Sequence, residues 1–264
     1  MAGDSPIFIG VCSGKGGVGK STVTVNLALA LRDLRMSVGV IDADFYGPDI
    51  PRMLNITRKV ETRFVTLWDS PQSKRGRPLS PVECLGIKVV SAQFLMGEAQ
   101  SFAVTGGFAG MLLDRFVNHV DWTGTDVVLI DLPPGTADLQ QRATALPGMA
   151  GCLVVTTPQD VSHLDARKLL SLLRYRGVRV LGGVENMAAF RCPCCDAEIA
   201  LFRPTPPDRA IWSASVPNLA SIPFHTEVTD ADHSGVPVVE RAPDSAPASA
   251  FADLARHVSA LIGG

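Results

Sequence analysis

The segment IFIGVCSGKGGVGKST, residues 7–22, joins a short apolar run to a glycine-rich loop and then to a helical pattern. The run from Ile7 to Ser13 is typical of a buried strand, and the loop after it matches the pattern G-x-x-x-x-G-K-[ST]. The loop consists of Gly14, Lys15, Gly16, Gly17, Val18, Gly19, Lys20 and Ser21, followed by Thr22. Glycines let backbone N–H groups close on a phosphate, and the following helix N-terminus adds its dipole. The segment therefore predicts a nucleotide phosphate site.

Two side chains at the end of this loop, called the P-loop below, have distinct predicted roles. Lys20 is placed to reach the terminal phosphates, and the Ser21 hydroxyl is placed to coordinate Mg²⁺. We therefore expect ATP and Mg²⁺ as cofactors. Lys15 is an additional lysine that a glycine-rich phosphate cradle does not itself need.

Beyond the P-loop, short β-branched runs alternate with helical stretches. This alternation predicts an α/β fold in which a doubly wound, mainly parallel sheet is flanked by helices. The expected strands are Ile7 to Ser13, Val38 to Asp42, Ile87 to Ser91, Val127 to Asp131, Cys152 to Thr156, Val178 to Glu185 and Leu219 to Ile222. We predict one domain over residues 1–264, with an excursion at about 55–81 and a cysteine-containing loop at about 190–207.

Carboxylates follow two of the expected strands. Asp42 and Asp44 end the strand that begins at Val38, and Asp131 follows four apolar residues in the Walker B position. Ligands bind at the carboxyl edge of doubly wound sheets, so the three side chains are expected to gather there. We predict that Asp131 holds Mg²⁺ through water and that Asp42 supports the metal shell. Each Asp taken alone could equally cap a turn or a helix.

Composition argues against several other classes of protein. The formal net charge of −2 gives no bulk basic field for nucleic acid or an anionic membrane. No apolar run approaches the roughly 20 residues of a membrane-spanning helix, and the N-terminus lacks the basic start of a signal peptide. We expect a cytoplasmic protein, in which the six cysteines do not form a disulfide framework.

With its early lysine, the sequence K-G-G-V-G-K-S-T from Lys15 resembles the deviant Walker A loop of the MinD and ParA class of dimerising ATPases. The resemblance implies a homodimer in which Lys15 crosses to the partner's nucleotide and acts in catalysis with Lys20. It also implies that Asp44 orients the attacking water and that Asn186 reads adenine. From the residues alone, Asn186 could equally belong to a turn after the strand ending at Glu185.

Several longer motifs occur in one order along the chain. They are D-A-D-F-Y-G-P-D-I-P-R-M-L from Asp42, D-L-P-P-G-T-A-D from Asp131, T-T-P-Q-D-V-S-H-L-D-A-R-K from Thr156, V-E-N-M from Val184 and C-P-C-C from Cys192. Together they resemble the Mrp-type, or ApbC-like, iron-sulfur cluster carrier ATPases. The resemblance implies slow ATP hydrolysis, a cluster donor, and recipient apoproteins that accept the cluster. The tryptophan-arginine-glycine-proline segment usual in that family is absent.

The cysteine motif supplies a C-x-x-C pair through Cys192 and Cys195, which matches the family's cluster-binding pair. A cluster takes four thiolates, so a symmetric dimer would bring two pairs together around one bridging 4Fe-4S cluster. The spacing fits a zinc clip across the same dimer equally well, and it fits a dithiol redox pair more weakly. Cys194 is extra, and by its spacing it could be a substitute ligand, a transfer ligand or a bystander. A nucleotide-switched regulator of the MinD or ParA kind is the alternative function.

Overall fold

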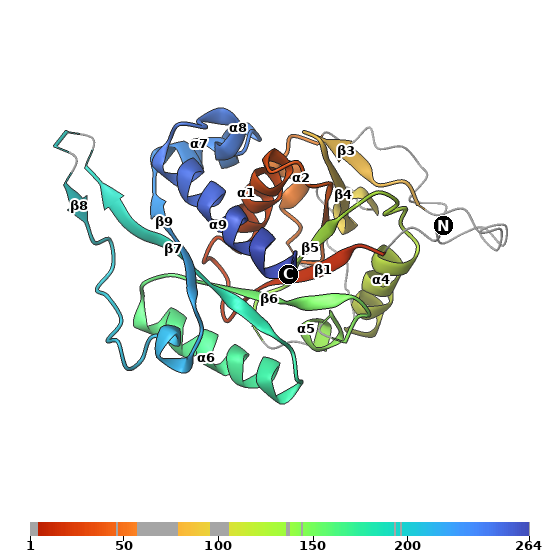
Figure 1. Cartoon of the computed structure of the whole chain (residues 1–264), viewed down its shortest axis with the longest axis horizontal. Coiled ribbons are helices and arrows are strands. Elements are labelled where there is room, and N and C mark those ends of the chain that lie inside the picture. The colour runs from red at the N-terminus through yellow and green to blue at the C-terminus, as the bar shows by residue number, and fades with distance from the viewer. Residues whose placement is uncertain are drawn as a thin grey trace.

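The computed structural model describes residues 5–45, 47–56, 79–95, 106–135, 138–143, 145–192, 194–195 and 197–263. Across these residues, one nine-stranded sheet forms the centre of the molecule, with helices on both faces (Figure 1). The strand order is β3-β4-β2-β5-β1-β6-β7-β8, and β9 pairs with β7. Among the described strands, β3 with β4 and β7 with β8 pair antiparallel, and the other pairs are parallel. The predicted doubly wound, mainly parallel sheet is confirmed.

The strands differ in length and burial, and β1, β2, β4, β5 and β6 are the mostly buried ones. Their bounds are β1 (Ile7–Ser13), β2 (Val38–Asp42), β3 (Val82–Cys84), β4 (Ile87–Ser91), β5 (Val127–Asp131), β6 (Met149–Thr156), β7 (Val180–Arg191), β8 (Glu198–Ile199) and β9 (Asn218–Phe224). The helices cover the two faces of the sheet. Their bounds are α1 (Lys20–Asp33), α2 (Ile50–Met53), α4 (Gly106–Asn118), α5 (Asp138–Ala143), α6 (Asp160–Tyr175), α7 (Thr226–Ser234), α8 (Val238–Arg241) and α9 (Ala246–Ile262), with the 3₁₀ turns η2 (Ala92–Leu95) and η3 (Ile211–Ala214).

The core is divided by the sheet into two apolar layers. Strand β1 contributes to both, because successive side chains of a strand point to opposite faces. Ile9 and Val11 pack with helices α1 and α9 on one face, whereas Phe8 and Cys12 pack with α4 and α6 on the other. This two-sided burial explains why the run is apolar at nearly every position. It fixes β1, and therefore the P-loop that follows it, in the middle of the molecule (Figure 1).

The expected strands are present, and their bounds agree best where a strand is a single short apolar run. β1, β2, β4 and β5 have the predicted bounds, whereas β6 begins earlier and β9 extends further at both ends. The prediction that β7 ends at Glu185 is wrong, because the strand continues to Arg191 past an irregular register after Asn186. The left-handed backbone of Met187, with φ of 55°, accompanies this irregularity. β3 and β8 have only three and two residues, too few to form a recognisable pattern.

The two expected excursions have different outcomes. Most of the first lies outside the described residues, which resume at Leu79. The second is not a simple loop: Phe190 pairs with Ile199 and Arg191 with Glu198, so β7 and β8 form a β-hairpin. We call residues 190–199 the cysteine hairpin. Figure 1 shows β8 and the end of β7 projecting from one side of the sheet.

Close packing of the P-loop against α6 gives the first prediction. A Cβ built on Gly14 would meet the carbonyl carbon of Asp165 at 2.3 Å and the amide nitrogen of Ala166 at 2.4 Å. Because these atoms belong to a helix backbone, Gly14→Ala forces the helix or the loop to move. We expect the variant to lose roughly 1–3 kcal/mol of unfolding free energy in urea denaturation. Gly16→Ala is the control, since its Cβ would meet Pro134 at 3.8 Å; equal losses in both variants would contradict this account.

Candidate functional site

The P-loop connects β1 to α1 through glycines in left-handed backbone conformations. Gly17 has φ of 77° and Gly19, the N-cap of α1, has φ of 79°. Other residues could adopt these angles only with strain, which explains the glycines in the motif. The first turn of α1 follows Gly19 directly, and its backbone N–H groups are the donors that a helix N-terminus can offer to a phosphate. Nothing lies within 4 Å of a Cβ built on Gly17.

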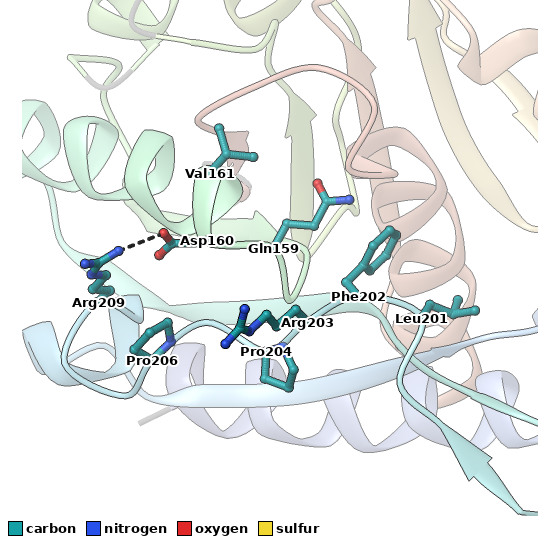
Figure 2. A pocket seen from close by; sticks show the side chains of 9 residues that line it. All are labelled: Gln159, Asp160, Val161, Leu201, Phe202, Arg203, Pro204, Pro206 and Arg209. Carbon is teal, nitrogen blue, oxygen red and sulfur yellow. Dashed lines mark hydrogen bonds and ion pairs between the residues drawn. The ribbon is translucent and has the colours of Figure 1, made fainter.

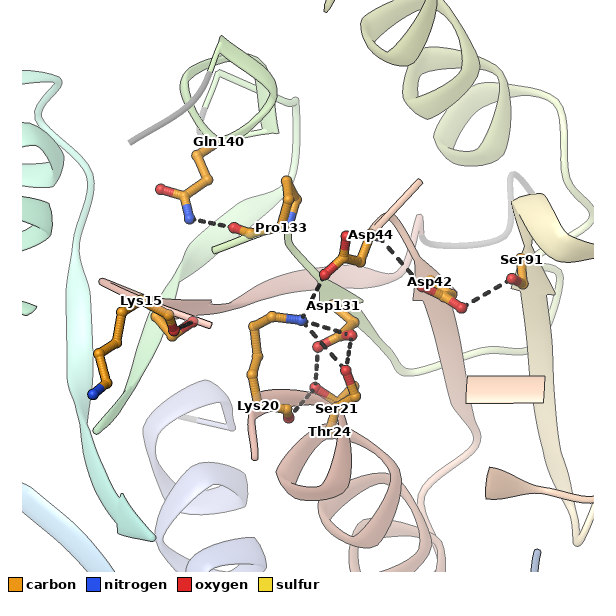
Figure 3. Close-up of polar contacts among 11 residues, drawn as sticks. Lys15, Lys20, Ser21, Thr24, Asp42, Asp44, Ser91, Asp131, Pro133 and Gln140 are labelled. Carbon is orange, nitrogen blue, oxygen red and sulfur yellow. Dashed lines mark hydrogen bonds and ion pairs between the residues drawn. The ribbon is translucent and has the colours of Figure 1, made fainter. Parts of the chain in front are cut away.

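A polar cluster lies beside this loop, and its centre is Asp131 at the end of β5 (Figure 3). The Lys20 ammonium is 2.8 Å from Asp131 Oδ2, and the Ser21 hydroxyl donates to the same oxygen at 2.7 Å. The hydroxyl of Thr24, one helical turn after Lys20, donates to Oδ1 at 2.8 Å. Three of the predicted site residues, Lys20, Ser21 and Asp131, therefore lie in direct contact.

The two carboxylates that follow β2 extend the cluster. Strand register places Asp42 opposite Asp131, and Ser91 Oγ donates to Asp42 Oδ2 at 2.9 Å (Figure 3). Asp44 Oδ2 lies 4.0 Å from Lys20 Nζ, and Asp44 is 18% exposed where Asp42 is fully buried. Burial, reinforced by the nearby Asp131 charge, raises the pKa of Asp42 well above its usual value. The three predicted carboxylates gather at one edge of the sheet, but in unlike environments.

The remaining predicted nucleotide residues lie around the same loop. Lys15 points away from the Asp131 cluster (Figure 3), and its ammonium donates to Gln159 Oε1 at 3.2 Å. Thr22 is buried in the first turn of α1. Asn186 was expected directly after a strand, and that placement is wrong: it lies within β7, where its Nδ2 donates to the Val18 carbonyl at 2.9 Å. The side chain therefore contacts the P-loop.

The three clustered cysteines lie at the tip of the cysteine hairpin. Cys192 is half-buried, its N–H donates to the Ala197 carbonyl at 2.9 Å, and Cys194 and Cys195 are exposed. The backbone N–H groups of Cys194 and Cys195 donate to the Cys192 sulfur and lower its thiol pKa. Among the described residues, no group of three or more histidine, cysteine or acidic side chains could hold a metal ion within one chain.

Sequence reasoning missed four polar residues of the candidate nucleotide site, and one of them is Thr24, which contacts Asp131. Ser91 contacts Asp42, Gln159 contacts Lys15, and Gln140 donates from α5 to the Pro133 carbonyl at 2.6 Å in the loop after Asp131. Ser91 could have been found, since it ends a predicted strand at the same sheet edge as Asp42. Gln159 and Gln140 gave no local signal, because their contacts depend on how distant elements pack.

Comparison with known proteins agrees with this geometry. The family profile described as "ParA: NUBPL iron-transfer P-loop NTPase" matches residues 6–259. This chain belongs to that family. Its relatives include the iron-sulfur cluster carrier protein of Synechocystis, 40% identical over 97% of this chain and 70% of its own length. The iron-sulfur cluster transfer protein NUBPL of Mus musculus is 35% identical over 94% of this chain and 75% of its own length.

Solved structures show the same fold for this NUBPL-type chain. A nucleotide-binding protein from Archaeoglobus fulgidus in complex with ADP matches with a TM-score of 0.72 and 34% identity, covering 90% of this chain and 89% of that one. The septum site-determining protein MinD of Pyrococcus horikoshii, complexed with Mg-ADP, matches with a TM-score of 0.73 and 25% identity over 98% of both chains. In the described parts of the chain, no helix is long and apolar enough to cross a membrane.

The raised pKa of Asp42 gives the second prediction. A carboxyl whose pKa is higher in the folded than in the unfolded state favours folding below the unfolded value of about 3.9, and this stability is lost as pH rises through the folded pKa. Asp42→Asn has no carboxyl at this position to titrate, so this loss of folding stability with rising pH should be absent from the variant. We expect its thermal midpoint in Mg²⁺-free buffer to match the unmutated protein near pH 4 and to exceed it by about 2–6 °C near pH 7.

Asp121→Asn is the control for this titration. Thr123 donates to Asp121 and lowers the pKa of that exposed carboxyl, so its replacement brings no gain as pH rises. A constant offset between Asp42→Asn and the unmutated protein across the pH range would show that the pKa of Asp42 is the same in the folded and unfolded states, contrary to this account.

Proposed function

We propose that this chain is an ATP-hydrolysing iron-sulfur cluster carrier that holds a bridging 4Fe-4S cluster in a homodimer and transfers it to apoproteins. The observation that carries the proposal is that one fold presents both a complete P-loop cluster around Asp131 and a projecting hairpin with Cys192 and Cys195. Family relatives named as cluster carrier or transfer proteins support the same reading.

The residues around the P-loop fit a nucleotide with Mg²⁺. Backbone N–H groups from Gly14 to Thr22 would surround the phosphates, and Lys20 would leave Asp131 to contact them. Ser21 would ligate Mg²⁺ directly, with Asp131 and Asp42 acting through water. When bound, the ion neutralises charge on the phosphate oxygens. Two carboxylates already buried near one lysine suit an added cation.

Two further side chains are proposed to act in hydrolysis. Asp44 is more exposed than Asp42 and lies 4.0 Å from the Lys20 ammonium, which suits a carboxylate that orients water near the terminal phosphate. Lys15 is directed away from its own Asp131 cluster, as expected of a group that serves a second protomer (Figure 3). Asn186 already contacts the P-loop, in keeping with a role in holding the adenine end of the nucleotide.

The cysteine hairpin is proposed to hold the cargo. A lowered pKa favours the Cys192 thiolate, the form that ligates iron, and Cys195 lies in the same tight turn. Two such pairs across a dimer axis give four ligands. Because zinc fits the same four thiolates, the iron-sulfur assignment rests on the family. The proposal places the protein in the cytoplasm, where thiols stay reduced, with apo iron-sulfur proteins and a cluster donor as partners.

Anaerobic reconstitution with ferrous iron and sulfide tests the cargo directly. We expect a brown dimer holding about four irons, and a colourless protein when Cys192 and Cys195 are both replaced by serine. Cys84→Ser is the control, since Cys84 is half-buried and lies in β3. Tightly bound zinc without a stable cluster would leave a nucleotide-binding dimer with a structural clip.

Steady-state ATPase assays test the two lysines. We expect Lys15→Ala to lower turnover by about 100-fold while ATP still binds, because the lost charge acts on the transferred phosphoryl group. Lys20→Ala should lose ATP binding as well. Lys168→Ala is the control, since Lys168 is an exposed lysine paired with Asp165 on α6. If Lys15→Ala hydrolysed ATP at the normal rate, the role of Lys15 across the dimer would be wrong.

A further inference from the structure

We call the part of β7 that leads into the cysteine hairpin its outgoing arm, and residues 200–209, which follow β8, its returning arm. The outgoing arm contacts the P-loop. β7 carries Asn186, whose side chain donates to the Val18 carbonyl at 2.9 Å, and Cys192 follows six residues later in the same strand direction. A Cβ built on Gly19 would lie only 2.2 Å from Asn186 Nδ2, so the contact between strand and loop is close. The position of this arm is therefore tied to the phosphate-binding loop.

The returning arm is fastened to a different part of the nucleotide site. After β8 the chain passes the start of α6, where the N–H and the hydroxyl of Thr205 both donate to the Pro158 carbonyl, at 3.1 and 2.8 Å. Arg209 pairs with Asp160 at 3.1 Å on the same stretch. Beside these two contacts, residues 201–209 and the start of α6 line a groove of about 690 Å³ (Figure 2).

Gln159, the residue after Pro158, connects the contact between Thr205 and Pro158 to Lys15. It is the N-cap residue of α6, with extended backbone angles, and its side chain accepts from the Lys15 ammonium at 3.2 Å. Pro158 and Gln159 are adjacent in one short turn between β6 and α6. Pro158 of this turn therefore contacts the returning arm, and Gln159 of the same turn contacts Lys15, the proposed catalytic lysine.

We propose that Gln159 and Thr205 are positioning residues that couple Lys15 to the cysteine hairpin. Gln159 keeps Lys15 within its own protomer until the lysine engages the partner's nucleotide. Release of Lys15 from Gln159 allows the turn that contains Pro158 to move. Because Thr205 is hydrogen-bonded to Pro158, the returning arm moves with the turn. The outgoing arm stays in place, because Asn186 holds it to the P-loop. Unequal movement of the two arms changes the geometry of Cys192 and Cys195. This inference rests on the proposed ATP-dependent dimer.

The contacts set the size of the effect. Each of the two Lys15 side chains in a dimer gives up one charge-assisted hydrogen bond on leaving Gln159, which sets the bias against nucleotide-driven dimerisation at about tenfold for each nucleotide bound. Loss of the Thr205 hydroxyl bond removes one of two bonds to Pro158, so coupling should weaken without loss of the fold. A ligand shifts such an equilibrium only through contacts that differ between the two states, and the bond between Lys15 and Gln159 is such a contact.

Amide hydrogen exchange, followed by mass spectrometry, measures this coupling on the iron-free full chain with Mg²⁺ and a non-hydrolysable ATP analogue. We expect the analogue to change exchange in peptides covering residues 188–200. In Thr205→Val the analogue-induced difference should fall at least threefold. In Gln159→Ala the hairpin should show the analogue-bound pattern in part without nucleotide, and dimerisation should need about tenfold less analogue.

Thr229→Val is the matched control, because it removes a threonine hydroxyl bond to a backbone carbonyl on α7, outside this connection. Hairpin peptides of this variant should respond to the analogue as in the unmutated protein. A purely structural role for Thr205 would raise exchange with and without the analogue and leave their difference intact, which would overturn the proposal. An unmutated hairpin that ignores the analogue would overturn it too. Since no iron is present, neither result depends on whether the cysteines hold a cluster.

Discussion

The buried ion pair between Lys20 and Asp131 is the interaction on which the rest of the site depends. Both side chains are almost excluded from solvent and lie 2.8 Å apart, so each charge needs the other. Lys20 is the first residue of α1 and Asp131 the last of β5, so the pair fastens the P-loop helix to the neighbouring strand. Parallel pairing of β1 and β2 with β5 brings Ser21 and Asp42 beside the same carboxylate.

The same arrangement leaves more negative than positive charge at this edge of the sheet. Asp42 and Asp131 occupy opposed positions on adjacent strands, and one lysine lies between them and Asp44. Two features reduce this excess of negative charge: the pKa of Asp42 is raised, and the Ser91 hydroxyl donates a hydrogen bond to Asp42. A site that stores unfavourable charge in this way gains most from an added cation. Stability and function thus pull in opposite directions here, as is common at binding sites.

Residues near the P-loop could be predicted because their signals are local. A run of buried apolar residues, a glycine loop and a carboxylate after an apolar run each occupy a few consecutive positions, and the strands ending in Ser13, Asp42 and Asp131 have their predicted bounds. The path of β7 could not be predicted, since the expected strand ended at Glu185 and its continuation depends on pairing with β9, which the local sequence does not reveal. The contact of Gln159 with Lys15 spans 144 residues, beyond any sequence pattern.

Strand direction relates the two halves of the proposed function. β1, β6 and β7 are parallel, so the carboxyl end of β7 lies on the same edge of the sheet as the P-loop. Glu185 pairs with Thr156 at that edge, and Cys192 follows seven residues later, which at about 3.3 Å per residue carries it roughly 20 Å beyond. A second protomer that approaches the P-loop edge to receive Lys15 therefore also approaches the projecting hairpin. One two-fold axis can serve both sites, because a single sheet edge presents them to the same side.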